Sequence, residues 1–342
     1  MNAISTVCIC GGGGQCHAIA PWLSAKGINV NILTNRPEMW NRNFDYLLPD
    51  GSRHSVTLGT ISANPAETVP QADVVIVTVP GFANEPELLR IKPHLKSGTF
   101  VGGVFSSNGF CFDALKILGN KFPIWGFQRV PFIGKIKEYG KIGNIMAYKT
   151  ALDIAVENAN NTDKEIFRTW IESTFSLPTR LHSSYLDVSL SNSNPLLHPA
   201  RIYTWLKDWN GIAPIQSNPL FYEEWPDEAS EAYIALDADL HKLMRHLPMN
   251  PDALPYILDY YEQTDAHTLS QKLHSIDSFK GIHMPVKETV DGWWPDMTSR
   301  YFLEDFRCGL KNYRELARKY NVDCPTIEKI YIWGEEFIKK HS

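Results

Sequence analysis

The 342-residue sequence has no long apolar run, no long run of charges of one sign and no internal repeat. A helix that spans a bilayer needs about 20 consecutive apolar residues, so we expect no membrane segment. The net charge of −5 argues against nucleic acid or an anionic membrane surface as a partner. No basic segment precedes the first apolar stretch, as a secretion signal would require. These absences favour a cytoplasmic globular protein.

Cysteine is scarce, with six in the chain and no C-x-x-C pair. Cys8 and Cys10 fall on one face of an apolar stretch, where cysteine behaves as a small hydrophobic residue. The spacing of the six cysteines fits neither a zinc site nor a disulfide framework. We therefore expect reduced thiols and no bound metal.

Glycine, in contrast, is concentrated in one place. An apolar stretch over 6–10 leads into four glycines, a helical pattern over 18–26 and a second apolar stretch over 28–33. In such a β–α–β unit, backbone N–H groups at a helix N-terminus can approach a pyrophosphate. Gly11-x-Gly13-x-x-Cys16 is a dinucleotide-binding fingerprint in which a small cysteine replaces the last glycine. The residues predicted to contact the dinucleotide here are Gly11, Gly13, Gly14 and Gln15.

The end of the second stretch indicates which dinucleotide is bound. An acidic residue there would accept a hydrogen bond from the ribose 2′-hydroxyl of NAD. The sequence instead has Asn35 and Arg36, with no carboxylate before Glu38. Because Arg36 could pair with a 2′-phosphate, NADP(H) is favoured, while NAD(H) remains possible. The alternative interpretation is that Arg36 is a solvated loop residue.

The first half continues as an alternation of strands and helices. Its apolar runs predict strands at 56–58, 72–79, 99–105, 123–127 and 177–181, and a strand pair over 144–156. Helices are predicted at 85–95, 110–118 and 163–173. The near-continuous apolar run over 72–79 is typical of a parallel strand covered on both faces. Pro80, which ends this strand, is predicted to lie at the carboxyl edge of the sheet, where the cofactor binds.

The pattern changes near residue 183. Helical segments rich in leucine and aromatic residues follow, at 186–190, 200–209, 228–247, 254–261, 268–273, 301–320 and 326–340. We therefore predict an α/β dinucleotide-binding domain of the Rossmann type over 1–183 and an all-α substrate domain over 184–342. A cleft between two such domains is the default position for a ligand site.

A nicotinamide enzyme needs an acid/base group to move a proton as hydride moves. His198 is the candidate, in the Pro-bounded segment Asn194-Pro-Leu-Leu-His198-Pro at the junction of the two halves. A lone histidine is more often a structural hydrogen-bonding residue. The second candidate segment, Arg300-Tyr-Phe-Leu-Glu-Asp305, could simply be the charged start of a helix.

Together, these two segments and the N-terminal glycine motif resemble the octopine/nopaline (opine) dehydrogenases, relatives of glycerol-3-phosphate dehydrogenase and ketopantoate reductase. The resemblance implies a helical domain like the C-terminal domain of 6-phosphogluconate dehydrogenase. It implies that His198 is the catalytic acid/base, with Asp305 as its partner. It also implies that Arg300 binds a substrate carboxylate and that Asn194 belongs to the site.

Two more substrate contacts are expected. Segment 126–131, which contains Gln128, lies where this family has a loop near the nicotinamide. Trp293, in a Gly-Trp-Trp-Pro loop ahead of Arg300, is expected to line the substrate pocket, although helical core is the alternative.

The reaction implied by the resemblance joins an amino acid to a 2-oxo acid through an imine, which hydride reduces to a secondary amine dicarboxylate. One alternative is an NADP-dependent reductase of a simple 2-oxo acid or a phosphorylated ketone. Such enzymes use a lysine, and Lys207 is the only lysine between residues 182 and 241. A second alternative is a non-catalytic NADP(H)-sensing protein. A homodimer is possible.

Overall fold

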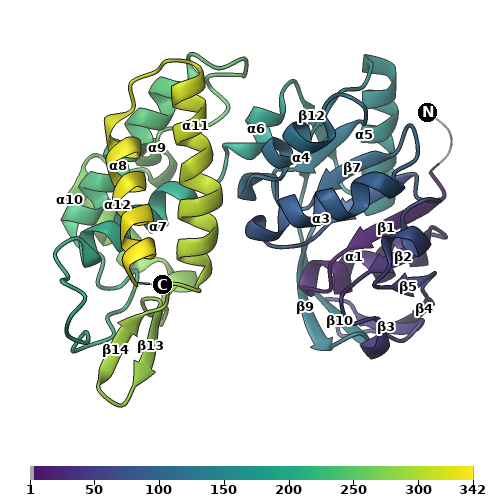
Figure 1. Ribbon diagram of the computed structural model, residues 1–342, viewed down its shortest axis with the longest axis horizontal. Helices are drawn as coiled ribbons and strands as arrows, with labels where there is room; N and C mark the ends of the chain where they lie inside the picture. Colours follow the sequence, from purple (N-terminus) through teal and green to yellow (C-terminus); the bar gives the residue numbers. More distant parts are fainter. Residues whose placement is uncertain (1–3, 342) are drawn as a thin grey trace. The chain divides into compact units, whose positions relative to one another are not determined.

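The computed structural model describes residues 4–341 and contains two compact units, residues 1–191 and 192–342 (Figure 1). The helix α6 (Tyr185–Ser189) belongs to the first unit, although the sequence analysis placed the domain boundary at 183/184. A capping box at Ser184 starts α6, and the helix buries Leu186 and Val188. Between residues 4 and 341, no helix combines the length and the apolar character needed to cross a membrane.

An eight-stranded sheet forms the centre of the first unit, in the order β12-β11-β8-β7-β6-β1-β2-β5. Neighbouring strands are parallel except β8 and β11, which are antiparallel. The strands are β1 (Thr6–Cys10), β2 (Asn29–Leu33), β5 (Ile61–Ser62), β6 (Val74–Val77), β7 (Phe100–Gly103), β8 (Ile124–Phe127), β11 (Leu152–Glu157) and β12 (Thr179–His182). The predicted Rossmann-type fold is confirmed.

Helices cover both faces of this sheet because side chains alternate along each strand. Val7 and Ile9 of β1 enter one core cluster, together with Ile19 of α1. Cys8 and Cys10 point the other way, into a cluster that contains residues of α3 and α4. The helices of the unit, besides α6, are α1 (Gly14–Ala25), α2 (Pro65–Thr68), α3 (Asn84–Ile91), α4 (Phe110–Leu118) and α5 (Asn161–Phe175).

A second, four-stranded sheet in the first unit was not predicted. Its order is β4-β3-β10-β9, with β3 (Asn43–Leu47), β4 (Arg53–Thr57), β9 (Phe132–Glu138) and β10 (Ile142–Tyr148). The strand predicted at 56–58 is β4, which begins earlier, at Arg53, ends at Thr57 and belongs to this second sheet. β4 pairs antiparallel with β3 and is largely exposed, so it lacks the apolar run of a covered strand.

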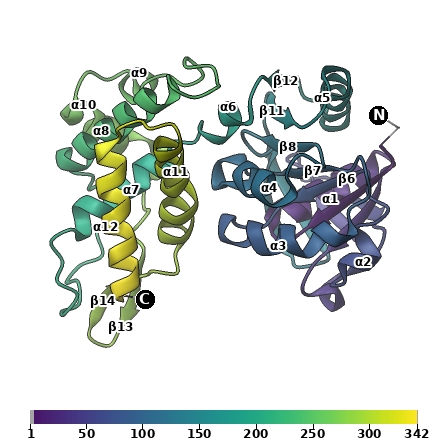
Figure 2. The same cartoon turned by 45° about the horizontal axis from the view of Figure 1, so that its top comes forward.

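The second unit is mainly helical, as predicted. Its helices are α7 (Asn194–Leu206), α8 (Asp227–Met244), α9 (Ile257–Tyr261), α10 (Ala266–Ser275), the π-helix η6 (Tyr301–Leu310), α11 (Lys311–Lys319) and α12 (Pro325–His341). Helix α12 packs against α7, α8 and η6 (Figure 2). One continuous helix is predicted over 301–320. In the structure its first ten residues form the π-helix η6, which is wider than an α-helix.

The all-α prediction omitted one hairpin, which projects from the helices in Figure 1. Strands β13 (Val286–Thr289) and β14 (Gly292–Pro295) pair antiparallel. β14 contains Trp293 and Trp294, so the predicted loop at this position is wrong. The hairpin escaped prediction because β13 is short and mostly exposed, without the apolar alternation of a half-buried strand.

Candidate active site

The glycine segment of the first unit forms a tight turn after β1. Gly11 has φ +123°, which L side chains rarely adopt, and a Cβ there would lie 2.5 Å from the Thr78 hydroxyl oxygen. Its N–H donates to the Leu33 carbonyl at 2.9 Å. A Cβ on Gly13, in contrast, would meet no atom within 4 Å, so the space beside this residue is open. The turn is therefore fixed at Gly11 and accessible at Gly13.

Helix α1 begins at Gly14 with no acidic residue in its first turn, so no carboxylate competes for its free N–H groups. Cys16 is fully buried, which fits the packing role of the glycine that it replaces. The Gln15 side chain donates to the Phe132 carbonyl at 3.1 Å and is thus bound to β9. The open space at Gly13 and the start of α1 at Gly14 are compatible with the pyrophosphate contact predicted for Gly11, Gly13, Gly14 and Gln15, which stays a prediction.

A buried histidine fastens a second element to this turn. The Gly140 N–H donates to His17 Nε2 at 2.8 Å, so His17 Nδ1 carries the proton and donates to the Gly13 carbonyl at 3.0 Å. Burial lowers the pKa of His17, which keeps the ring neutral. The Tyr139 hydroxyl lies 2.6 Å from the position of a Cβ on Gly12. The β9–β10 turn therefore lies directly against the glycine segment.

Other predicted cofactor residues follow the carboxyl ends of parallel strands. Asn35 and Arg36 are exposed after β2. Arg90 of α3 donates to the Asn35 side-chain oxygen at 3.1 Å and pairs with Glu87 at 3.0 Å. Pro80 is exposed after β6, and no carboxylate occupies positions 35 and 36. The predicted substrate residue Gln128 follows β8, and its N–H donates to the Asp153 carbonyl at 2.8 Å.

In the second unit, residues that are 107 positions apart form a buried acid/base pair. His198 of α7 and Asp305 of η6 are 1% and 7% exposed, and His198 Nδ1 lies 2.7 Å from Asp305 Oδ2. The imidazole N–H therefore donates to the carboxylate. The other ring nitrogen, Nε2, lies 3.1 Å from the Tyr222 hydroxyl. This carboxylate–imidazole arrangement fixes the tautomer and stabilises an imidazolium when one forms.

Close packing of two helices makes this pair possible. A Cβ on Gly309 of η6 would lie 2.6 Å from the Cβ and Cγ atoms of Pro195 in α7, so only glycine allows this approach. Pro195 precedes His198 by about one turn, and Gly309 follows Asp305 by a similar distance. The glycine therefore permits the contact between imidazole and carboxylate.

Arg300 lies next to this pair at the start of η6. It is exposed, its guanidinium lies 5.5 Å from the centre of the Tyr301 ring, and it has no ion-pair partner within residues 4–341. The Tyr301 ring in turn packs edge-on against His198 at 4.5 Å. Burial and the nearby Asp305 raise the pKa of Glu304, while Arg300 opposes that shift. Arg300 is thus an exposed cation that the Tyr301 ring links to His198.

The remaining predicted residues of this unit differ in position. Asn194 is four residues before His198 in α7, so both project from the same side of the helix. Trp293 lies in β14 and forms a backbone bridge with Ile215, its carbonyl accepting from the Ile215 N–H at 2.7 Å. Among the described residues, no group of three or more His, Cys, Asp or Glu side chains could hold a metal ion.

Residues 181–338 match the family model described as "NAD/NADP octopine/nopaline dehydrogenase, alpha-helical domain". A tauropine dehydrogenase from Arabella iricolor is 29% identical over 97% of this chain and 91% of its own length. An octopine dehydrogenase from Mizuhopecten yessoensis is 28% identical over 98% and 90%, respectively. The chain is therefore similar to opine dehydrogenases over nearly its whole length, and its second unit matches the helical domain of that family. It is an oxidoreductase of the type that acts on CH–NH bonds and binds a nicotinamide dinucleotide.

Solved structures agree with this assignment. An octopine dehydrogenase with NADH and L-arginine superposes with a TM-score of 0.83 at 26% identity, covering 98% of this chain and 90% of the other. A ketopantoate reductase from Ralstonia eutropha, at 12% identity and a TM-score of 0.63, shares the fold alone.

Several residues that contact these segments were not predicted. Tyr301 stands inside the motif that carries Arg300 and could have been noticed there. Tyr222 lies in an irregular segment whose sequence has neither a motif nor a helical period, and only its contact with His198 marks it. No sequence motif marks His17 or Tyr139, because their contacts depend on the second sheet, which was not predicted.

Proposed function

We propose that this opine dehydrogenase condenses an amino acid with a 2-oxo acid by using His198 as acid/base, Asp305 as its partner and Arg300 as a carboxylate ligand. The observation that carries the proposal is the buried hydrogen bond of 2.7 Å between His198 and Asp305, with the exposed Arg300 guanidinium linked to His198 through the Tyr301 ring. A buried imidazole with a carboxylate on one nitrogen can gain and lose a proton at the other nitrogen.

The chain's own residues account for the proton and orientation requirements. A reduced nicotinamide dinucleotide, held at Gly11, Gly13 and Gly14, would supply the hydride for reduction of the imine. His198 in its protonated form polarises the oxo group and supplies the proton with which the carbinolamine oxygen leaves as water. Before this transfer, Asp305 stabilises the positive charge of the protonated ring. Arg300 binds one carboxylate through two parallel hydrogen bonds and so determines which face of the imine is presented.

Asn194, Gln128 and Trp293 are proposed as further substrate contacts. Asn194 is supported by its position one helical turn before His198. Gln128 is supported by its place at the carboxyl edge of the parallel strands, and Trp293 by its partly exposed ring on β14. A relative's structure contains L-arginine, which supports an amino acid as one of the two substrates.

We propose NADP(H) as the preferred cofactor, although a relative's structure contains NADH. Exposed Asn35 and Arg36 follow β2 with no carboxylate at either position, whereas Arg90, which is bonded to Asn35, is already paired with Glu87, so the proposal rests on Arg36. A charge-assisted hydrogen bond contributes about 1.5–3 kcal/mol, so Arg36→Ala should reduce kcat/KM for NADPH about 10- to 100-fold. The same constant for NADH is the internal control, and equal losses for both cofactors would contradict the preference.

The decisive experiment for the reaction measures NADPH oxidation with panels of amino acids and 2-oxo acids. Turnover that requires both partners supports the proposal, and turnover with the oxo acid alone identifies a simple reductase. His198→Ala should reduce kcat about 100- to 10,000-fold, and Asp305→Ala should reduce kcat by a smaller factor. Both variants should retain NADPH binding. A fully active His198→Ala variant would show that the acid/base lies elsewhere.

Neither alternative gains support from a specific contact. Lys207, the lysine of the reductase alternative, pairs with Glu228. A cofactor sensor would bind NADPH without turnover in the two-substrate panel. The cytoplasmic location and the homodimer stay predictions, which cell fractionation and light scattering would test.

A further inference from the structure

His198 has both ring nitrogens engaged inside the second unit. Nδ1 donates to Asp305 at 2.7 Å, and Nε2 accepts from the Tyr222 hydroxyl at 3.1 Å. His198 is 1% exposed and Tyr222 is 5% exposed, and the Tyr222 hydroxyl occupies the hydrogen-bonding position at Nε2 that a substrate oxygen would otherwise take. We propose that the Tyr222 hydroxyl carries the proton between His198 and the substrate. This inference rests on the proposed role of His198 as acid/base.

The backbone around Tyr222 is held by a buried cation. Arg201, one helical turn beyond His198, donates from Nε to the Phe221 carbonyl at 3.1 Å and from Nη2 to the Glu224 carbonyl at 3.0 Å. Arg201 is 5% exposed, and burial lowers its pKa to about 10, so it remains charged at neutral pH. A buried charge is costly unless it is hydrogen-bonded. Here the charge binds the two carbonyls that flank the Tyr222 position.

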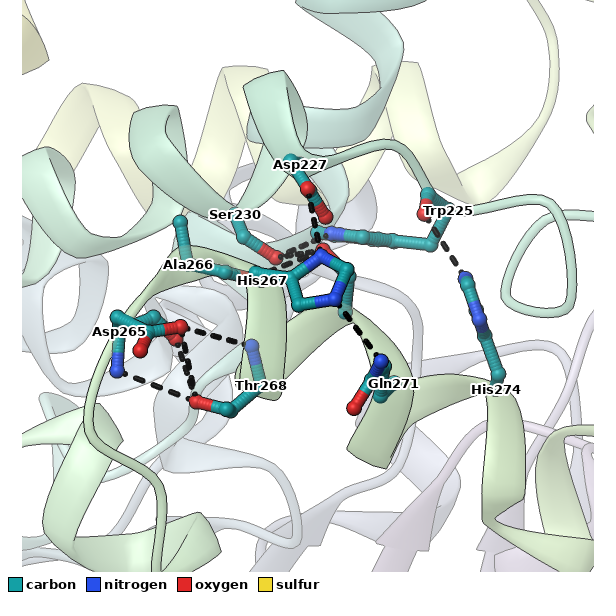
Figure 3. A network of polar contacts seen from close by, with 10 residues as sticks. Trp225, Asp227, Ser230, Asp265, Ala266, His267, Thr268, Gln271 and His274 are labelled. Atoms are coloured by element: carbon teal, nitrogen blue, oxygen red, sulfur yellow. Dashed lines mark hydrogen bonds and ion pairs between the residues drawn. The ribbon is translucent and has the colours of Figure 1, made fainter.

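Trp225 fixes the other end of the same segment (Figure 3). Its indole N–H donates to Ser230 at 2.9 Å, and its carbonyl accepts from His274 Nε2 at 2.9 Å. The Tyr222 ring is nearly parallel to the Trp225 ring, with centres 6.2 Å apart, and stacks on Phe279 at 4.0 Å. The ring plane is therefore set by its neighbours, and the hydroxyl is held toward His198 without depending on that hydrogen bond alone.

A hydroxyl in this position can pass a proton without keeping a charge. Burial raises the pKa of Tyr222 well above its ordinary value, so the neutral phenol persists at neutral pH. In the forward step, the His198 Nε2–H bond breaks and its proton goes to the Tyr222 oxygen. At the same time the Tyr222 O–H bond breaks, and that proton goes to the substrate oxygen that leaves as water. Tyr222 is neutral before and after, and His198 ends neutral.

Other ionisable groups near His198 are engaged differently. Asp305 is bonded to Nδ1, and Tyr301 presents its ring to the imidazole at 4.5 Å. Arg300 and Glu304 lie beyond Tyr301 at the start of η6. Tyr222 is therefore the one hydroxyl, among the described residues, that is hydrogen-bonded to the proton-donating nitrogen.

Tyr222→Phe tests the proposal, because it removes the hydroxyl and keeps the stacked ring. We expect kcat to fall about 100-fold, the lower end of what general acid catalysis supplies. The KM values and NADPH affinity should change little. In mixtures of H2O and D2O, the rate of the unaltered enzyme should depend on deuterium content along a curve, as two moving protons require. The variant should give a straight line.

Tyr313→Phe is the matched control. Its hydroxyl is equally buried in the second unit but donates to the Asn192 carbonyl at 3.3 Å, not to His198. This variant should keep the kcat and the curved isotope dependence. If Tyr222→Phe retains kcat within about threefold, the relay is refuted. If Tyr222→Phe lowers only the KM for the oxo acid, the hydroxyl merely obstructs binding of that substrate, and this result also refutes the relay. A loss of thermal stability with unchanged kcat and curvature would assign it a structural role only.

His198→Ala separates the relay from the function on which it rests. An inactive His198→Ala with a normal Tyr222→Phe overturns the relay alone. An active His198→Ala, or an unaltered enzyme without two-substrate turnover, overturns both.

Discussion

The contact between Gly309 and Pro195 leads to a quantitative prediction for Gly309→Ala. The added methyl would lie 2.6 Å from two carbons of Pro195, where ordinary contact begins near 3.4 Å. Because a proline ring is rigid, α7 and η6 must move apart by about 0.8 Å. That movement would lengthen the His198–Asp305 distance from 2.7 Å to about 3.5 Å, the limit of a hydrogen bond.

Two measurements should respond to that movement. Overpacking of this kind costs about 1–3 kcal/mol of stability, which lowers the thermal midpoint of the second unit. A displacement near 1 Å at a catalytic group can cost about 100-fold in rate, so we expect kcat to fall between about 10- and 100-fold. NADPH affinity should not change, because the glycine segment belongs to the first unit. Steady-state kinetics, calorimetry and a fluorescence titration measure these three quantities.

A double variant shows whether the clash itself is the cause. Pro195→Gly removes the facing carbons, so Pro195→Gly combined with Gly309→Ala should recover part of the lost kcat relative to the sum of the single changes. The reasoning is refuted if Gly309→Ala keeps kcat within twofold, or if the two losses simply add.

Three further predictions concern other parts of the chain. His17→Phe keeps the aromatic packing but loses both hydrogen bonds, one to the glycine segment and one to the β9–β10 turn. If about 1 kcal/mol of that loss is felt by the cofactor, the Kd for NADPH should rise about 5-fold, and an unchanged Kd in fluorescence titration would contradict this. Gly13→Ala should leave stability unchanged and weaken NADPH binding, because its methyl enters open space. Gly11→Ala should lower stability by at least about 1–2 kcal/mol because of its φ of +123°. Thermal melts of both variants test the expected difference in stability. Burial raises the pKa of Asp237 to about 6 from 3.8, so the folded state favours the protonated acid and the free energy of unfolding falls as pH rises from 4 to 6. Asp237→Asn should remove this pH dependence from thermal melts between pH 4 and 6. If the variant shows the same pH dependence as the unaltered protein, the assignment to Asp237 is refuted.

The first unit was largely predictable because its central strands carry a simple signal. The stretch 6–10 is apolar at every buried position. The glycines that follow it indicate a tight turn from the sequence alone, and the structure shows that Gly11 is needed there for steric reasons. The second sheet was missed because β9 and β4 are mostly exposed and carry lysine, arginine and serine in place of an apolar alternation. Residues at such edges are placed by pairing with β3 and β10, which no local pattern encodes.

The candidate site of the second unit was predictable only through resemblance. Nothing local links His198 to Asp305 across 107 residues, and each has an ordinary structural interpretation by itself. Tyr222 was missed because its place depends on Arg201, Trp225 and Phe279, three contacts from different parts of the chain. The π-helical form of η6 was also not visible, because its apolar spacing satisfies an α-helix nearly as well.

The π-helix makes the length of one short segment as important as its composition. Its hydrogen bonds join residues five apart, so η6 holds one more residue in each turn than an α-helix can. Deleting a single residue between Tyr301 and Asp305 would let the segment rewind into an α-helix and swing the carboxylate about 100° around the helix axis. Related chains should therefore vary in side chains along this segment but conserve its residue count. Loop grafts that alter substrate choice should stop before Arg300.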